Sequence, residues 1–234
     1  MDAIDVAFDF RTDATGPDVD SSSHTLKRYH QSLWSKPLPN GEIFNLDADQ
    51  KDSYLQYQSK DKTFNLSSDS ISNSYRDRKR KDISEIVSKS PLEAKLFQDL
   101  GNTIGGYIIF PYKVEGLSIN QARGVSPQIA DRFDLTLECI RLHYLGEANP
   151  LAEVLNRNKD FFRLFETFTG YVKFFLLDDL VSQSYDLINF FLPNFDFEKS
   201  GYPKNAVEYM EYMENSITFT QRRNQRIQTW ATSQ

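Results

Sequence analysis

The stretch Gly105-Gly106-Tyr107-Ile108-Ile109-Phe110-Pro111 is the part of the sequence that decides the fold. Between the glycines and the proline its residues are all apolar, a pattern typical of a strand that is buried on both faces. Upstream, apolar residues recur with a period near two from Ile43 to Leu66, with polar turns at 47–52 and 59–62. This alternation predicts a small antiparallel meander, so we expect the N-terminal half to supply a sheet.

Downstream of this strand the sequence is mainly helical. Ser126-Pro127 is typical of an N-cap followed by proline at the first helical position, and Gly146 of a helix end, which predicts a helix over 127–145. Two further strands are expected, over 6–10 and 185–192. The other expected helices cover 25–34, 91–100, a short stretch from 149, an aromatic stretch over 160–181 with a kink at Gly170, and 204–229, whose Val207, Met210, Met213 and Ile217 share a face.

These patterns predict the fold class α+β, with a small antiparallel sheet in the N-terminal half packed against a mainly helical C-terminal half. We expect residues 1–234 to form a single domain, because a chain of this length can bury one substantial core. Residues 67–90 are polar and predict a flexible loop or variable insertion. Their charge run, 76–82, is interpreted as a solvated surface segment, with contact to an anionic partner as the alternative.

The composition limits the class of protein. Hydrophobic residues make up 39% of the chain and charged residues 26%, as in a folded globule. The formal charge of −6 disfavours nucleic acid as a partner, and no apolar window is long enough to cross a bilayer, so no membrane partner is expected. The N-terminus does not resemble a signal peptide, and the single cysteine, Cys139, excludes an intramolecular disulfide. We therefore expect a cytoplasmic protein.

The helix expected over 127–145 carries the candidate site. Asp131, Asp134, Glu138 and Arg141 are three or four residues apart and line one side, although apolar residues surround the axis. Buried carboxylates need cations or hydrogen-bond donors, which the preceding loop, 118–124, offers. One interpretation is an internal salt-bridge network that locks loop to helix. The other is a pocket in which arginines hold an anionic group and a carboxylate acts as a base.

A second polar cluster lies near the N-terminus. It contains Arg11, Asp13, Asp18, Asp20, His24, Lys27, Arg28 and His30. Its spacing fits no EF-hand loop, so no metal site is predicted, although several carboxylates lie close together. His30, beside Tyr29 and Trp34 on a helix, is interpreted mainly as a packed histidine, with a chemical role as the minority hypothesis.

Several segments resemble a family of bacterial proteins of unknown function. The resemblance is carried by residues 8–13, 29–31, 33–41, 119–124, 129–141, 170–172 and 190–193, whereas 47–90 matches poorly. It implies that both polar clusters belong to one recurring unit. We therefore hypothesise that they converge, with Arg11, Asp13 and His30 facing Asn120, Arg123, Asp131, Arg132 and Glu138.

The functional expectation is a nucleotide- or phosphate-ligand-binding protein, either a transferase or a hydrolase. The cofactor is unknown, and no metal ligand is predicted. The alternative is a non-catalytic interaction protein from a bacterium or a mobile element, an accessory or inhibitory factor with a protein partner. In the first case the expected catalytic residues are Glu138, Asp134 and His30, and the expected ligand-binding residues are Arg11, Asn120, Arg123, Asp131 and Arg132.

Overall fold

The computed structural model describes residues 3–49, 54–75, 81–89, 93–112, 116–193 and 196–233. Its sheet has four antiparallel strands in the order β1-β2-β3-β4. At the centre of the pairing between β3 and β4, Ser68 lies opposite Ile109. The five residues of β4 are all buried, which confirms the expected strand. The meander is also confirmed. The strands are β1 (Leu46–Asp47), β2 (Leu55–Gln58), β3 (Thr63–Ser70) and β4 (Tyr107–Pro111).

Helices are concentrated after β4, so the prediction of an α+β fold is confirmed. Before β4 lie α1 (Val19–Ser22), α2 (His24–Trp34), α3 (Lys81–Ser88) and α4 (Glu93–Gly101). After β4 lie α5 (Ile119–Val125), α6 (Phe133–Leu145), α7 (Ala152–Arg157), α8 (Lys159–Arg163), α9 (Phe168–Phe174) and α10 (Ala206–Thr232). Short 3-10 helices cover Phe10–Thr12, Ile104–Gly106 and Asp178–Leu180.

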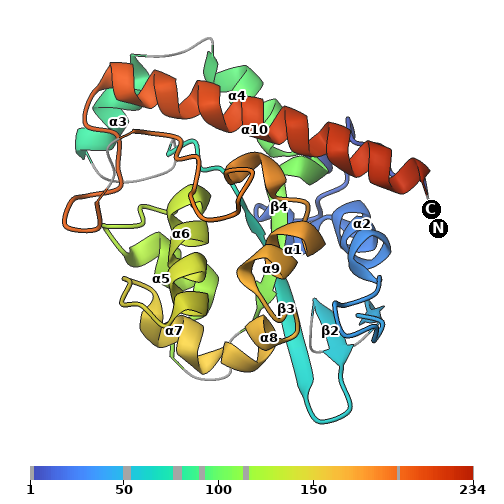
Figure 1. Cartoon of the computed structure of the whole chain (residues 1–234). Helices are drawn as coiled ribbons and strands as arrows, with labels where there is room; N and C mark the ends of the chain where they lie inside the picture. The colour runs from blue at the N-terminus through green and yellow to red at the C-terminus, as the bar shows by residue number, and fades with distance from the viewer. Residues whose placement is uncertain are drawn as a thin grey trace.

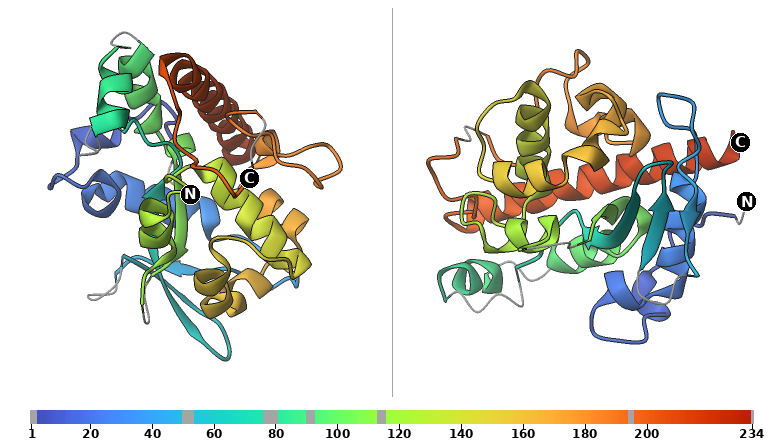
Figure 2. Two further views of the ribbon diagram at one scale, coloured as in Figure 1. Left: turned by 90° about the vertical axis from the view of Figure 1, so that its left-hand side faces the viewer. Right: turned by 90° about the horizontal axis from the view of Figure 1, so that it is seen from below.

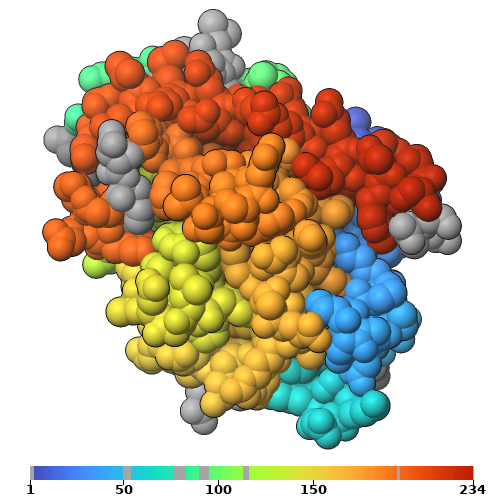
Figure 3. All heavy atoms as spheres, in the orientation of Figure 1, coloured from blue at the N-terminus to red at the C-terminus, as the bar shows by residue number. Residues whose placement is uncertain are grey.

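The sheet lies between two groups of helices. Helices α1 and α2 lie on one side of the strands and α6 to α9 on the other, as both views in Figure 2 show. The long helix α10 crosses the molecule and packs against α4 (Figure 1). Figure 3 shows the surface of the molecule in the orientation of Figure 1. On this face α10 forms the upper edge, and residues between α7 and α10 cover the centre. Among the described residues, no helix is both long and apolar enough to cross a membrane.

The α8–α9 side of the sheet holds an aromatic core. The ring of Phe165 has its centroid 4.9 Å from that of Phe174 and 5.3 Å from those of Phe161 and Tyr171. All of these rings are buried. Their burial explains the high aromatic content of the sequence, because such rings need a large apolar interior.

The helix that was expected to begin at Pro127 begins at Phe133. Ala130 and Asp131 adopt left-handed backbone angles (φ 50° and 59°), which an α-helix cannot include. Its predicted end is confirmed by Gly146, which is left-handed at the C-cap. The prediction of a loop over 118–124 is wrong, because α5 begins there with a reciprocal capping box between Ser118 and Gln121.

The aromatic stretch 160–181 is three short helices instead of one long helix. Left-handed residues at Glu166 (φ 61°) and Leu176 (φ 54°) interrupt it, and α9 begins after the N-cap Thr167. The predicted strands over 6–10 and 185–192 are also wrong. Described residues in those ranges form turns, the start of a 3-10 helix and one isolated bridge at Ile188.

The last helix is confirmed. Of the residues expected to share a face, Met213 is buried, whereas Val207 is 76% exposed and Met210 is 36% exposed. Tyr209 and Tyr212 are also buried, so tyrosines supply much of the buried face of this helix.

The prediction of a loop over 67–90 is wrong for two parts of this segment. Residues 67–70 belong to β3, and 81–88 form α3. The charged residues 76–80 lie outside the described part of the chain.

Candidate functional site

The pair Arg132–Asp134 forms a closed buried network. Arg132 Nε donates to Asp134 Oδ1 at 3.1 Å, and its Nη1 donates to the carbonyl of Gly201 at 3.0 Å. The second carboxylate oxygen of Asp134 accepts from the backbone N–H of Phe191 at 2.9 Å. Asp134 is 0% exposed and Arg132 2%. Both side chains are held by the protein itself, so this geometry does not favour either as a ligand contact.

Glu138 and Arg11 are likewise occupied. Arg141 donates twice to Glu138, at 2.7 Å each, along the surface of α6. Arg11, whose side chain is 40% exposed, pairs with Asp9 and Asp99. The expected convergence therefore does not bring Arg11, Arg132 or Glu138 to a common site.

Strand β3 does bring other predicted residues together. His30 contacts Ser68, Asn120 contacts Ser68, and Arg123 contacts Asp69 and the carbonyl of Ser70. Arg123 is fully buried, and its Nη2 also donates to the carbonyl of Asp131 at 3.1 Å. Asp13 contributes indirectly: it accepts from Ser23 Oγ at 2.6 Å and from the N–H of Thr25 at 2.8 Å.

A cavity of about 820 Å³ lies beside this part of β3. We call it the main cavity. It is bounded by α1 and the start of α2, by the residue before β2, by residues 66–69 of β3, and by the start of α5. Its lining is mostly polar and consists of Thr15, Asp18, Asp20, Ser21, Ser22, Ser23, His24, Lys27, Tyr54, Leu66, Ser67, Ser68, Asp69, Tyr112, Ser118, Asn120 and Gln121.

Two buried polar atoms of this lining have no hydrogen-bond partner in the described part of the chain. They are Tyr54 Oη and Asn120 Oδ1. The ring of Tyr54 packs edge-on to that of His30 at 6.4 Å, and Lys27 Nζ lies 5.7 Å from its centroid. Buried polar groups are nearly always satisfied, so two exceptions in one cavity indicate a place for a ligand.

Two carboxyl groups of the cavity have raised pKa values. Burial, a hydrogen bond with Asp18 and the charges of Asp18 and Asp69 raise the pKa of Asp20 to about 9. Burial raises the pKa of Asp69 to about 6, although the charge of Arg123 opposes the rise. At neutral pH Asp20 is therefore protonated, and its acid proton is shared with Asp18. Within the described residues, no group of three His, Cys, Asp or Glu side chains is arranged to hold a metal ion.

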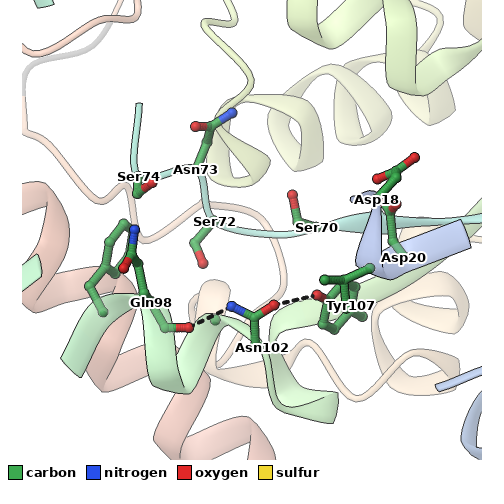
Figure 4. Close-up of a pocket in the computed structure, with 12 residues that line it drawn as sticks. Asp18, Asp20, Ser70, Ser72, Asn73, Ser74, Gln98, Asn102 and Tyr107 are labelled. Carbon is green, nitrogen blue, oxygen red and sulfur yellow. Dashed lines mark hydrogen bonds between the residues drawn. The ribbon is translucent and has the colours of Figure 1, made fainter. Parts of the chain in front are cut away.

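A smaller cavity of about 290 Å³ adjoins the main cavity and shares Asp18 and Asp20 with it. Figure 4 shows Ser70, Ser72 and Asn73 along one wall, opposite Asn102 and Tyr107. Asn102 accepts from the hydroxyl of Tyr107 at 3.0 Å and donates to the carbonyl of Gln98 at 2.8 Å. These groups are paired, so the small cavity carries less evidence for a ligand than the main one.

The sequence indicates Asp18 and Asp20 as part of the N-terminal cluster, but sequence reasoning missed the serines at 21–23 and the polar segment 67–74. The prediction of a loop over 67–90 includes that second segment. The available signal was the alternation Phe64, Leu66, Ser68 and Ser70, which continues the inward face of β3 with serines. Hydroxyl groups on the buried face of a strand indicate a polar pocket there.

Comparison with known proteins identifies one family. The model of a family described as "Family of unknown function (DUF6994)" matches residues 4–227. No curated protein and no solved structure matches the chain. The match covers nearly all of the described fold, including the main cavity.

Proposed function

Because the chain belongs to DUF6994, a family of unknown function, its own site has to supply the evidence, and we propose that it binds a small polar molecule in the main cavity. The unpartnered atoms Tyr54 Oη and Asn120 Oδ1 carry this proposal. A buried polar group without a partner costs about 1–3 kcal/mol of stability. A ligand that hydrogen-bonds to both atoms would remove that cost.

The ligand class that fits best is a nucleotide or another phosphate-bearing small molecule. Lys27 and the exposed His24 are the basic side chains in the lining, and they lie on α2 where the cavity meets solvent. They suit a phosphate group. The carboxyl pair of Asp18 and Asp20 and the serine hydroxyls of α1 suit the hydroxyl groups of a sugar. The arginines that the sequence suggested as phosphate ligands are paired with carboxylates. Lys27 is therefore the better candidate for the phosphate contact.

A transferase or hydrolase activity is part of this proposal. Such a reaction needs a base beside the ligand, and Asp69 lines the main cavity. Its pKa, raised by burial to about 6, suits proton transfer near neutral pH. We also propose a cytoplasmic location and a bacterial origin. The first is supported by the chain's single cysteine, because disulfides are rare in the cytoplasm.

The alternative is a non-catalytic interaction protein. It is favoured by exposed apolar side chains on α4 and α10, two helices that pack against each other. Leu96 on α4 is 50% exposed, and Val207 on α10 is 76% exposed. A protein partner that covers these side chains would explain their exposure.

The test is ligand binding by calorimetry and thermal shift. The panel contains nucleoside monophosphates, the matching nucleosides, sugar phosphates and inorganic phosphate. We expect a phosphate-bearing compound to bind, and Lys27→Met to weaken its binding about tenfold, with less effect on the matching nucleoside. Lys95→Met is the control, because Lys95 pairs with Asp99 and does not line the cavity.

A second variant tests the location of the site. Ser21 is exposed and lines the main cavity, so Ser21→Trp should fill the cavity without unfolding the protein. It should abolish binding. If no compound of the panel binds, or if Ser21→Trp and Lys27→Met bind as the unchanged protein does, the proposed function is wrong and the interaction protein gains.

A further inference from the structure

A chain of hydrogen bonds leads from the protein core to the wall of the main cavity. Trp34 Nε1 donates to His30 Nδ1 at 3.0 Å, and His30 Nε2 lies 2.9 Å from Ser68 Oγ. Trp34 and His30 are completely buried, and Ser68 is 5% exposed. Of these residues, Ser68 lines the cavity.

The direction of this chain follows from which atoms can donate. An indole N–H can only donate, so His30 Nδ1 must accept and carries no proton. The proton of the neutral imidazole is then on Nε2, which donates to Ser68 Oγ. Protonation of the ring is opposed, because burial and the charge of Arg223 lower the pKa of His30 to about 3. A general-acid role for His30 therefore finds no support in this geometry.

The hydroxyl proton of Ser68 has to point elsewhere. Its oxygen already accepts from His30. The hydroxyl of Tyr54 lies close enough to Ser68 to affect the pKa of Tyr54, but the geometry of the two groups is not that of a hydrogen bond. The hydroxyl of Ser68 therefore presents a donor to the cavity. The amide of Asn120 is anchored to the same residue, because Asn120 Nδ2 donates to the carbonyl of Ser68 at 3.0 Å. This leaves Asn120 Oδ1 as an acceptor without a partner.

We infer that Ser68 and Asn120 recognise an acceptor and an adjacent donor on the ligand, in that order. Such a pair is found on the amide-like edge of a nucleobase. Ser68 Oγ would donate to a ring carbonyl or ring nitrogen, and Asn120 Oδ1 would accept from the adjacent N–H. His30 is a positioning residue that acts through Ser68. The inference rests on the proposed function and narrows its ligand to compounds that carry a base.

The experiment measures selectivity, which a purely structural role would not change. The full chain is titrated with uridine, guanosine, 3-methyluridine and 1-methylguanosine, whose added methyl group removes the ring N–H. We expect at least one unmodified nucleoside to bind about tenfold more tightly than its methylated form. Ser68→Ala should weaken binding of that nucleoside about tenfold. It should leave the methylated form nearly unchanged, because the methyl group would clash with Asn120 and so keep the adjacent carbonyl away from Ser68. Ser68→Thr, which keeps the hydroxyl, should restore the selectivity.

Two further variants test the relay, by which we mean the hydrogen-bonded series Trp34, His30 and Ser68. His30→Phe removes the donor to Ser68 and should reduce the same selectivity, whereas Thr15→Ala should not. Thr15 also lines the cavity, but its hydroxyl donates to the carbonyl of Ser22 and not to the recognition groups. Thermal melting without ligand shows which variants fold. If Ser68→Ala does not fold, Asn120→Ser takes its place, because its shorter side chain removes the acceptor.

Failure of the inference is distinguishable from failure of the proposed function. If a sugar phosphate binds in the cavity and no nucleoside does, base recognition is wrong and phosphate binding stands. The same holds if nucleosides bind but Ser68→Ala and Asn120→Ser keep the selectivity of the unchanged protein. If nothing binds, both are wrong.

Discussion

The network around Arg132 and Asp134 and the cavity wall around Ser68 and Asn120 are both polar and buried, yet they differ in one respect. Each charged group described in the first network has a partner from the protein. The second leaves two polar atoms without one. The comparison teaches that charge inside a protein does not by itself mark a site. Hydrogen-bonding capacity that the fold leaves unused is the better indication.

The largest expected effect is the loss of Asp134. Asp134→Ala leaves the guanidinium of Arg132 buried without its counter-charge and removes the acceptor of the Phe191 N–H. We expect the free energy of unfolding to fall by about 3–5 kcal/mol, measured by urea denaturation. Asp134→Asn, which keeps an acceptor, should lose less. A loss below about 1 kcal/mol for Asp134→Ala would show that this network is not structural.

The pH dependence of stability tests the buried relay. The pKa of His30 is about 3 in the folded protein and near 6.5 in the unfolded chain, so between these values only the unfolded chain binds this proton. Stability therefore falls as the pH falls. From pH 6.5 to 5 the unchanged protein should lose about 2 kcal/mol relative to His30→Gln.

The comparison with His30→Gln is needed because Asp20 acts in the opposite direction. Its raised pKa makes the folded state bind more protons between about pH 4 and 9, and this contribution cancels between the two proteins. Denaturation followed by circular dichroism measures the difference. Parallel pH curves for the two proteins would mean that His30 is not held neutral.

Two tyrosines allow a direct comparison between a buried hydroxyl group that has a hydrogen-bond partner and one that has none. Tyr75 Oη donates to the carbonyl of Ala130 at 2.8 Å, whereas Tyr54 Oη has no partner in the described residues. Tyr75→Phe should cost about 1 kcal/mol of stability, and Tyr54→Phe should be neutral or stabilising by up to about 1 kcal/mol. Thermal melts of the two variants measure this difference. Equal destabilisation would mean that Tyr54 does have a partner within the protein.

The smallest expected effect concerns Glu138, which the sequence suggested as a catalytic residue. Glu138→Gln breaks a pair along the surface of α6, in which the side chains of Glu138 and Arg141 are 14% and 19% exposed. We expect a loss of about 0.5–1 kcal/mol by urea denaturation and no change in ligand binding. A lost ligand response with unchanged stability would move the site from the main cavity to α6.

Much of the fold was predictable because local signals agreed with long-range packing. The apolar run of β4 and the left-handed Gly146 at the end of α6 needed no tertiary information. Other boundaries did. Glu166 and Leu176 are left-handed because surrounding packing outweighs their own preference, and no local signal indicated the two breaks. The capping box at Ser118 is readable in the sequence, because Ser118 and Gln121 have the residue types and spacing of that motif.

The candidate site was only partly predictable. Asn120, Asp13 and His30 were identified by residue type, and they do lie at or beside the cavity. The roles of Arg132 and Glu138 could not be decided, because a buried charge looks the same in sequence whether or not the fold neutralises it. Ser68 was missed because its contacts with His30 and Asn120 span 38 and 52 residues.

The relay behind Ser68 has a practical consequence, because its inner end is a tryptophan and the chain contains only two. Trp34 is fully buried, whereas Trp230 lies in the partly exposed last turn of α10. The indole of Trp34 shares a hydrogen bond with the imidazole that holds Ser68, so a change in the electronic surroundings of Ser68 reaches a chromophore. In a Trp230→Phe background, emission from Trp34 would report occupancy of the cavity without any attached dye.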